Sequence, residues 1–125
     1  MVKQAKLIPI YTTRGEVGAL LGYPYLFNLR GEWIGWVKPD RRIYSVHGHY
    51  AGYLTDEPRI LRKQSDGYAF DREQPPPKPP KVIPPATMPL APLMKELSYG
   101  LLDVLQDAPD LLPCVDFGDL REDMD

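Results

Sequence analysis

The chain has 125 residues, about the length of one domain, with an apolar fraction ordinary for a globular protein. The formal net charge of −2 argues against a nucleic-acid-binding domain, because such domains are usually basic. Cys114 is the only cysteine, so no intramolecular disulfide can form, and no apolar run approaches the roughly 20 residues that span a bilayer. The first residues do not resemble a secretion signal, and we expect a cytoplasmic protein without a transmembrane segment.

An internal repeat runs through residues 7–71. Superposing Phe27–Tyr44 on Tyr44–Leu61, a shift of 17 residues, aligns glycines with glycines and aromatic residues with aromatic residues. The aligned pairs are Gly31 and Gly48, Gly35 and Gly52, Trp33 and Tyr50, and Trp36 and Tyr53. An earlier copy aligns at a shift of 16, with Gly15 on Gly31 and, after one deletion, Gly18 on Gly35. A degenerate fourth copy leads to Asp66-Gly67 and Tyr68-Ala69-Phe70.

Each copy is typical of a β-hairpin with a glycine at its tip. Glycine supplies the positive φ that tight hairpin turns need. The predicted tips are Arg14-Gly15, Arg30-Gly31, His47-Gly48 and Asp66-Gly67. Proline-containing turns separate the copies, which predicts eight short strands. We expect these strands near residues 7–13, 16–20, 25–29, 32–37, 42–46, 49–54, 59–63 and 68–71.

The predicted strands are apolar on both faces. In Trp33–Val37, strict alternation places Trp33 and Val37 on one side and Ile34 and Trp36 on the other. A sheet with one wet face would alternate apolar and polar residues, so something must cover both faces. Gly35 and Gly52 lie in mid-strand, where glycine marks a bend, a bulge or close approach of another backbone.

This Gly-tipped repeat, with its Gly-aromatic-apolar strands, resembles the four-fold β-flower domain over residues 7–71. The resemblance implies a mainly β fold in which four bent β-hairpins form a shallow, barrel-like ring. The resemblance by itself points to no particular activity, catalytic residue or cofactor. The predicted organisation is a four-hairpin β domain (1–74), a Pro-rich linker (75–89) and a C-terminal region (90–125).

The C-terminal region changes period. Residues 90–106 predict one amphipathic helix that follows Pro-rich, extended chain. We expect its apolar stripe to dock on the β domain, on a second subunit or on a protein partner. The stripe consists of Leu93, Met94, Leu97, Leu101, Leu102 and Leu105. Residues 75–125 are acidic and residues 1–74 are basic, so the acidic end is either solvated or docked on the basic half of its own chain or a neighbour.

Several surfaces could bind a ligand. The equivalent tip residues Arg14, Arg30 and His47 could form a crown for an anion or an acidic peptide, although polar residues are ordinary at wet tips. His47 and His49 have a metal-like spacing but no third ligand, so we predict no metal site. Two other candidates have simpler explanations. Lys38, Arg41 and Arg42 lie near aromatic residues and could form a nucleic-acid surface, but those aromatic residues recur at the repeat spacing, which a core explains. Pro76–Pro79 could be a peptide ligand, but such a run is more often a spacer.

The leading hypothesis is a non-enzymatic binding or assembly module, with the β domain as platform and the tail as the docking element in a homo-oligomer or protein complex. The alternative is a small apolar-ligand or lipid-binding barrel, an idea that rests partly on similarity in outline to lipid-associated barrels. In that alternative, Trp33, Trp36, Tyr50 and Tyr53 are the walls of its mouth. An enzyme is the third hypothesis. The sequence contains no phosphate loop, nucleophile elbow or paired-carboxylate signature, so the third hypothesis needs a site assembled only in space.

Overall fold

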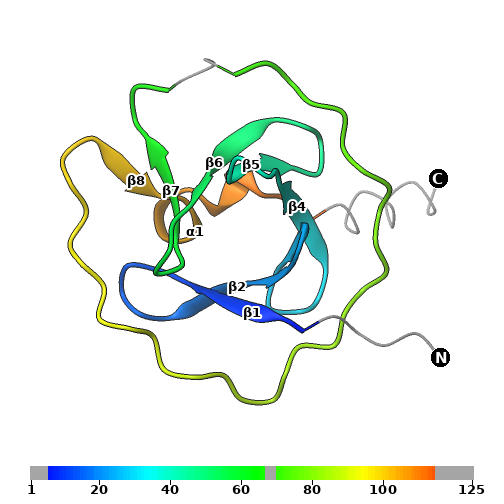
Figure 1. Ribbon diagram of the computed structural model, residues 1–125, viewed down its shortest axis with the longest axis horizontal. Coiled ribbons are helices and arrows are strands. Elements are labelled where there is room, and N and C mark those ends of the chain that lie inside the picture. Colours follow the sequence, from blue (N-terminus) through cyan, green and yellow to red (C-terminus); the bar gives the residue numbers. More distant parts are fainter. Residues whose placement is uncertain (1–5, 67–69, 115–125) are drawn as a thin grey trace.

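The computed structural model describes residues 6–66 and 70–114, which form one antiparallel sheet of eight strands followed by two short helices. The strands pair strictly in chain order, from β1 to β8, and curl into a ring of four hairpins (Figure 1). The elements are β1 Ile8–Tyr11, β2 Val17–Gly22, β3 Tyr25–Phe27, β4 Trp33–Val37, β5 Arg42–Ser45, β6 Tyr50–Leu54, β7 Ile60–Lys63, β8 Leu101–Asp103, α1 Val104–Asp107 and the 3-10 helix η1 Pro109–Leu111. We call the hairpins β1–β2, β3–β4, β5–β6 and β7–β8 the first to fourth petals.

The tips of the first three petals confirm the predicted glycine turns. Gly15, Gly31 and Gly48 have φ values of 87°, 82° and 86°, a region that side chains resist. Each glycine N–H donates to the carbonyl three residues earlier, as Gly31 does to Asn28 at 3.0 Å. The same turn therefore reverses the chain three times, and the repeat in the sequence is a repeat in the backbone.

A one-residue bulge follows each of these turns. The strand register skips Gly18 in the first petal, Ile34 in the second and Ala51 in the third. Ala19 pairs with Ile10 as Gly35 pairs with Leu26, so Ala19 is the true equivalent of Gly35. The predicted alignment of Gly18 on Gly35 after a deletion is wrong, because the first two copies align at a shift of 16 with no gap.

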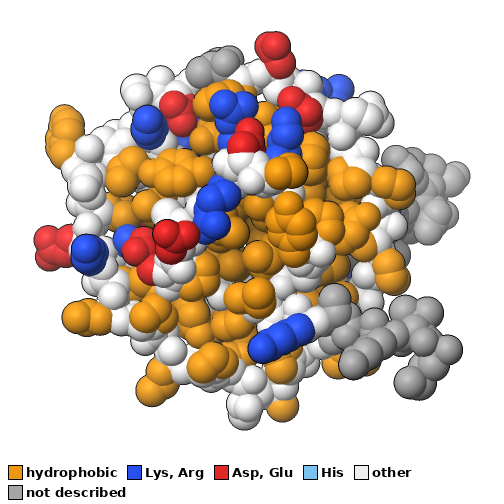
Figure 2. Space-filling view, viewed as in Figure 1, with side chains coloured by type: hydrophobic (Ala, Val, Ile, Leu, Met, Phe, Trp, Pro, Cys, Tyr) orange, Lys and Arg blue, Asp and Glu red, His pale blue; other side chains and the backbone are white. Residues whose placement is uncertain are grey.

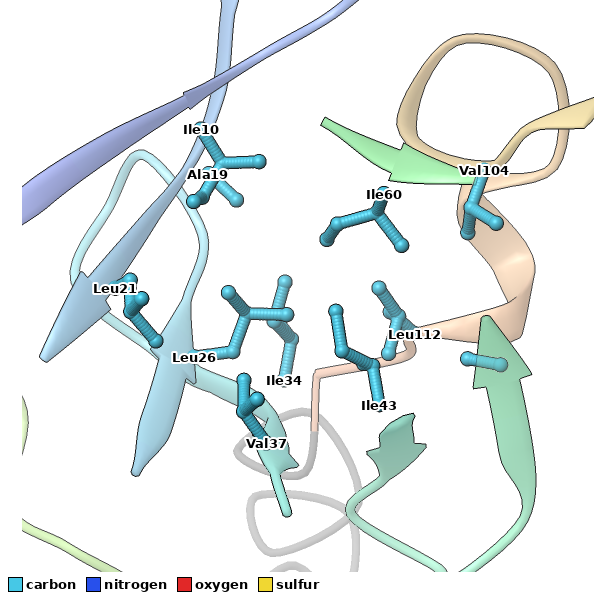
Figure 3. Packing of buried hydrophobic residues seen from close by; sticks show 11 residues of the cluster. Ile10, Ala19, Leu21, Leu26, Ile34, Val37, Ile43, Ile60, Val104 and Leu112 are labelled. Atoms are coloured by element: carbon cyan, nitrogen blue, oxygen red, sulfur yellow. The ribbon is translucent and has the colours of Figure 1, made fainter. Parts of the chain in front are cut away.

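The bulges separate the apolar side chains into two clusters. The inner cluster fills the centre of the ring with aliphatic residues and includes Ile34 and Val37 (Figure 3). The outer cluster contains Trp33, and Trp36 packs against it. The prediction that Ile34 and Trp36 share a face is wrong, because the bulge breaks the strict alternation of side chains. The prediction that both faces are covered is confirmed for this strand.

The fourth petal departs from the other three. Its second strand is β8, which pairs with β7 through Leu61–Asp103, Arg62–Leu102 and Lys63–Leu101. The predicted eighth strand at residues 68–71 is therefore wrong as the partner of β7, and its residues Tyr68 and Ala69, like Gly67 of the fourth tip, lie outside the described residues. Instead of a tight tip, the fourth petal carries a long excursion of chain before β8.

We call residues 70–99 of this excursion the belt, because they run round the outside of the ring (Figure 1). The belt has neither helix nor strand, as expected for its prolines. It is held to the petal tips by backbone hydrogen bonds, from Glu73 N–H to the Gly48 carbonyl (2.8 Å) and from Val82 N–H to the Gly31 carbonyl (3.1 Å). Val82 and Met88 of the belt pack on the outer cluster and cover it.

The predicted helix at residues 90–106 is wrong in its bounds. The helix in this region is α1, which spans only Val104–Asp107, and Leu101–Asp103 form strand β8. Gly100 precedes β8 with a φ of 88°, which a helix does not allow. The apolar stripe fits a helix by period alone, but pairing with the open edge of β7 satisfies the backbone of residues 101–103, leaves Leu101 and Leu102 half-buried and buries Asp103.

Asp103 closes the ring between the last strand and the first petal. Its fully buried carboxylate accepts hydrogen bonds from Thr13 N–H (2.7 Å) and Thr13 Oγ1 (2.6 Å), and it caps α1 by accepting from Gln106 N–H (3.2 Å). The guanidinium of Arg59, itself buried, donates to Thr13 Oγ1 at 3.0 Å and to the Lys95 carbonyl at 3.0 Å. This network joins the first petal, the fourth petal and the belt.

Candidate functional site

The four aromatic residues predicted to be the walls of a barrel mouth lie elsewhere. Aliphatic side chains fill the ring interior (Figure 3), and Trp33 is only 5% exposed in the outer cluster, with its Nε1 donating to the Gly35 carbonyl at 2.7 Å. Trp36 stacks on Tyr44 with ring centroids 5.3 Å apart. Tyr50 and Tyr53, their equivalents on the third petal, line surface hollows. The interior of the ring is thus a packed core, and hollows lined by aromatic residues lie outside it.

The third petal carries an aromatic cluster that also involves the start of the belt. The rings of Tyr50 and Phe70 lie 4.3 Å apart, and Tyr44 meets Tyr50 edge-on at 5.9 Å. The guanidinium of Arg42 lies 4.3 Å from the Phe70 ring centroid, and that of Arg62 lies 5.1 Å from the Tyr50 ring. The cations and aromatic faces stabilise one another and hold Phe70 against the petal.

Two hollows flank the Tyr50–Phe70 pair. The first, of about 340 Å³, we call the notch; it is lined by Ser45, His47, His49, Tyr50, Arg62, Phe70, Asp110, Leu111 and Pro113. The second, of about 330 Å³, is lined by Asp40, Arg41, Arg42, Tyr50, Tyr53, Leu54, Lys63, Asp66 and Phe70. Both have mixed apolar and polar walls, which is the usual character of small-ligand sites.

The Tyr50 hydroxyl keeps its proton at neutral pH. Burial raises the pKa of Tyr50 to about 12, and the neighbouring Asp66 carboxylate adds to the rise. The hydroxyl donates to Asp66 Oδ2 at 3.4 Å. Tyr50 therefore serves as a neutral aromatic wall between the two hollows.

The predicted crown of tip residues is spread round the circumference. The tips point outward at separate places on the ring (Figure 1), and each lies beside a different stretch of belt. Arg14 is exposed at the first tip, and Arg30 pairs with its neighbour Glu32 at 3.1 Å at the second. His47 lines the notch together with His49. Arg14 lines a different hollow, at the first tip, so the structure does not bring the three predicted tip residues together.

Each of the three basic residues at the turn after β4 has an acidic partner. Lys38 pairs with Glu73 of the belt at 3.2 Å. The other two pairs are Arg41 with Asp56 at 3.2 Å and Arg42 with Asp40 at 3.6 Å. Figure 2 shows basic and acidic side chains side by side on the face in view, with hydrophobic side chains between them. This pairing leaves no continuous basic track there for a phosphate backbone.

The apolar tail residues divide between packed and bare positions. Leu101 and Leu102 lie on β8, and Leu105 packs against the inner cluster. Met94 and Leu97 are half-buried, whereas Leu93 is 98% exposed. The C-terminal region therefore docks in its own chain mainly through residues 101–105, with Leu112 adding to the core. The acidic residues after Cys114 lie outside the described residues.

Two carboxylates with shifted pKa lie far apart in the fold. Hydrogen bonding from the Asn28 amide lowers the pKa of Glu32 at the second tip, and hydrogen bonding from Arg59 lowers the pKa of Glu57 in the turn before β7. Each is explained by its local partner. In the described part of the chain, His, Cys, Asp and Glu side chains form no group of three that could hold a metal ion.

Sequence reasoning missed most of the notch. Phe70 falls on the expected eighth strand of the degenerate fourth copy, Arg62 reads as an ordinary strand residue, and Asp110, Leu111 and Pro113 come from a distant segment. Leu112 anchors that segment in the core beside Gly35, which brings its neighbours to the third petal.

Comparison with known proteins agrees with this architecture. A family model described as 4-fold beta flower protein matches residues 8–102, from the start of β1 to the middle of β8. Neither the curated proteins nor the solved structures contain a match to the chain. Within the described residues, no helix is long and apolar enough to cross a membrane. The matched region covers most of the chain and all four petals, and the chain belongs to the 4-fold β-flower protein family.

Proposed function

We propose that the chain is a non-enzymatic binding and assembly module, in which the ring is a rigid platform and the belt presents the docking surface to a second copy of the chain. The observation that supports this is a pair of leucines on the belt, Leu90 and Leu93, which are 96% and 98% exposed. Two large apolar side chains so close together and so bare mark an interaction surface.

The backbone between these leucines is held in place on both sides. The Tyr11 hydroxyl donates to the Pro89 carbonyl at 2.8 Å, and Arg59 Nη1 donates to the Lys95 carbonyl at 3.0 Å. Pro92 lies between them and restricts the backbone further. A partner that binds this arc thus has little chain to order, so more of the contact energy becomes affinity.

A hollow lies beside the protruding leucines. Its volume is about 420 Å³, and its walls combine the first tip with the belt: Thr13, Arg14, Gly15, Leu90, Ala91, Pro92, Leu93 and Met94. A surface that has both a knob and an adjacent hollow can pair with its own copy about a two-fold axis, each knob entering the other hollow. The patch is smaller than a standard interface, so the dimer is weak, with a Kd in the micromolar range or above.

Sedimentation equilibrium of the full chain from about 10 to 500 μM tests this proposal, because the range brackets that affinity. We expect the average mass to rise with concentration, and the double variant Leu90→Ser/Leu93→Ser to stay monomeric with an unchanged Tm. Tyr99→Ser is the matched control, since Tyr99 is a bare apolar residue of the same belt outside this arc. A wild-type chain that is monomeric throughout, or a double variant that associates like wild type, rejects the proposal.

A further inference from the structure

We propose that the notch on the third petal is a binding site for a small planar aromatic carboxylate. The ring of the ligand lies among Tyr50, Phe70, Leu111 and Pro113, and its carboxylate meets the imidazoles of His47 and His49. This inference is independent of the belt arc, which lies beside the first tip and shares no lining residue with the notch.

The imidazoles stand on a rigid turn. Ser45 Oγ accepts hydrogen bonds from both His47 N–H (3.2 Å) and His49 N–H (3.3 Å), and Gly48 between them has a φ of 86°. From the other side, Arg72 Nε donates to the His47 carbonyl at 2.7 Å and Glu73 N–H to the Gly48 carbonyl at 2.8 Å. The two exposed side chains are therefore attached to a fixed backbone at one rim of the notch.

The apolar walls are equally well anchored. Tyr50 is braced by Phe70, Tyr44 and the guanidinium of Arg62, which also donates to the Tyr50 carbonyl at 2.9 Å. Leu111 and Pro113 flank Leu112, which is buried in the inner cluster. Two walls of fixed position with apolar and aromatic surfaces suit a flat apolar group, which can enter without ordering the site.

Charge selects the polar end of the ligand. The groups in the lining that gain positive charge on protonation are His47 and His49, with Arg72 behind the tip, and the acid in the lining is Asp110. Asp66 is occupied by the Tyr50 hydroxyl, which stays neutral. When the imidazoles are protonated, the notch has an excess of positive charge and favours a single carboxylate.

The test is a titration of the full chain with 2-naphthoate, 2-naphthamide and 2-naphthylmethylamine, followed by amide chemical shifts in heteronuclear NMR spectra. We expect naphthoate to perturb residues 45–50 and 110–113 and to bind roughly fivefold or more tighter at pH 5.5 than at pH 8, because lower pH favours protonated imidazoles, which attract the carboxylate. The neutral amide binds more weakly and shows no such pH dependence.

Variants separate the charge from the shape of the site. His47→Gln/His49→Gln should remove the pH dependence, and Asp110→Asn should strengthen naphthoate binding. Arg30→Gln, at the equivalent tip of the second petal, is the matched control and should change neither. Equal affinity for acid and amide, preference for the amine, or no perturbation at about 10 mM ligand, roughly ten-thousandfold above a Kd of about 1 μM, overturns the proposal.

Discussion

The second and third petals have the same backbone and different coverings. Trp33 and Trp36 of the second petal occupy the repeat positions of Tyr50 and Tyr53 in the third. On the second petal, Val82 and Met88 of the belt complete the outer cluster. On the third petal, Phe70 covers only part of the aromatic surface, and hollows remain on both sides. The difference shows that a repeated strand can be covered core at one place and a partly open surface at another, according to which residues of the connecting chain pack over it.

The largest expected effect comes from replacing equivalent aromatic residues with alanine, Trp33 in the second petal and Tyr50 in the third. Trp33→Ala should lower the free energy of unfolding by about 3–5 kcal/mol, because it leaves a cavity between strand and belt. Tyr50→Ala should cost roughly 1–2 kcal/mol, because Tyr50 already borders open space. Denaturant unfolding followed by tryptophan fluorescence for Tyr50→Ala, and by circular dichroism for both, measures the two costs. Equal losses would contradict the distinction between a covered and an open petal.

A smaller effect is expected where the belt crosses a petal tip. Gly31 needs a positive φ, and a Cβ there would overlap the carbonyl oxygen of Val82. Gly31→Ala should therefore cost about 3 kcal/mol, of which only 1–2 kcal/mol is the left-handed backbone.

Gly100 is the matched control for this substitution. It has a φ of 88°, but no atom lies within 4 Å of a Cβ built on it. Gly100→Ala should lower the free energy of unfolding by about 1 kcal/mol, the cost of the left-handed backbone alone. The comparison uses thermal and urea unfolding of the two variants, and a Gly31→Ala chain as stable as the Gly100→Ala chain would show that the belt does not press on the second tip.

The smallest expected effect is confined to alkaline pH and concerns the third petal. The pKa of Tyr50 is raised from 10.0 to about 12, so the folded state holds this proton more tightly than the unfolded state. The resulting stabilisation is complete below pH 10 and is lost as the pH rises toward 12. Tyr50→Phe should flatten this decline in stability, measured as urea midpoints between pH 9 and 11.5. An unchanged slope would mean that Tyr50 is no more buried than a free tyrosine.

Much of the ring could be predicted from residue types and spacing. Gly15, Gly31 and Gly48 specify the turns, since a positive φ is a local demand that a single residue meets. Seven of the eight strands lie where the repeat placed them, because their hydrogen bonds link neighbours in the chain. The apolar residues on both faces of Trp33–Val37 correctly predicted that each face is covered, but they did not predict which segment covers it.

Long-range competition accounts for the errors. A period of apolar residues at 90–106 fits a helix, but Leu101–Asp103 instead complete the sheet, because β7 offers an unpaired edge and the belt is long enough to bring them there. The notch likewise joins residues near 47, 62, 70 and 111, which no spacing rule connects.

The sequence by itself determined the glycine turns, the order of the hairpins and the need for two apolar layers, because each depends on contacts between near neighbours. Only the tertiary structure decided which segment closes the ring, which petal stays open and that His47 and Leu111 line the same hollow. Those outcomes depend on which surfaces of the ring the few apolar side chains of the belt and the C-terminal segment cover. Several surfaces compete for these side chains, so the outcome is fixed only when the whole chain is folded.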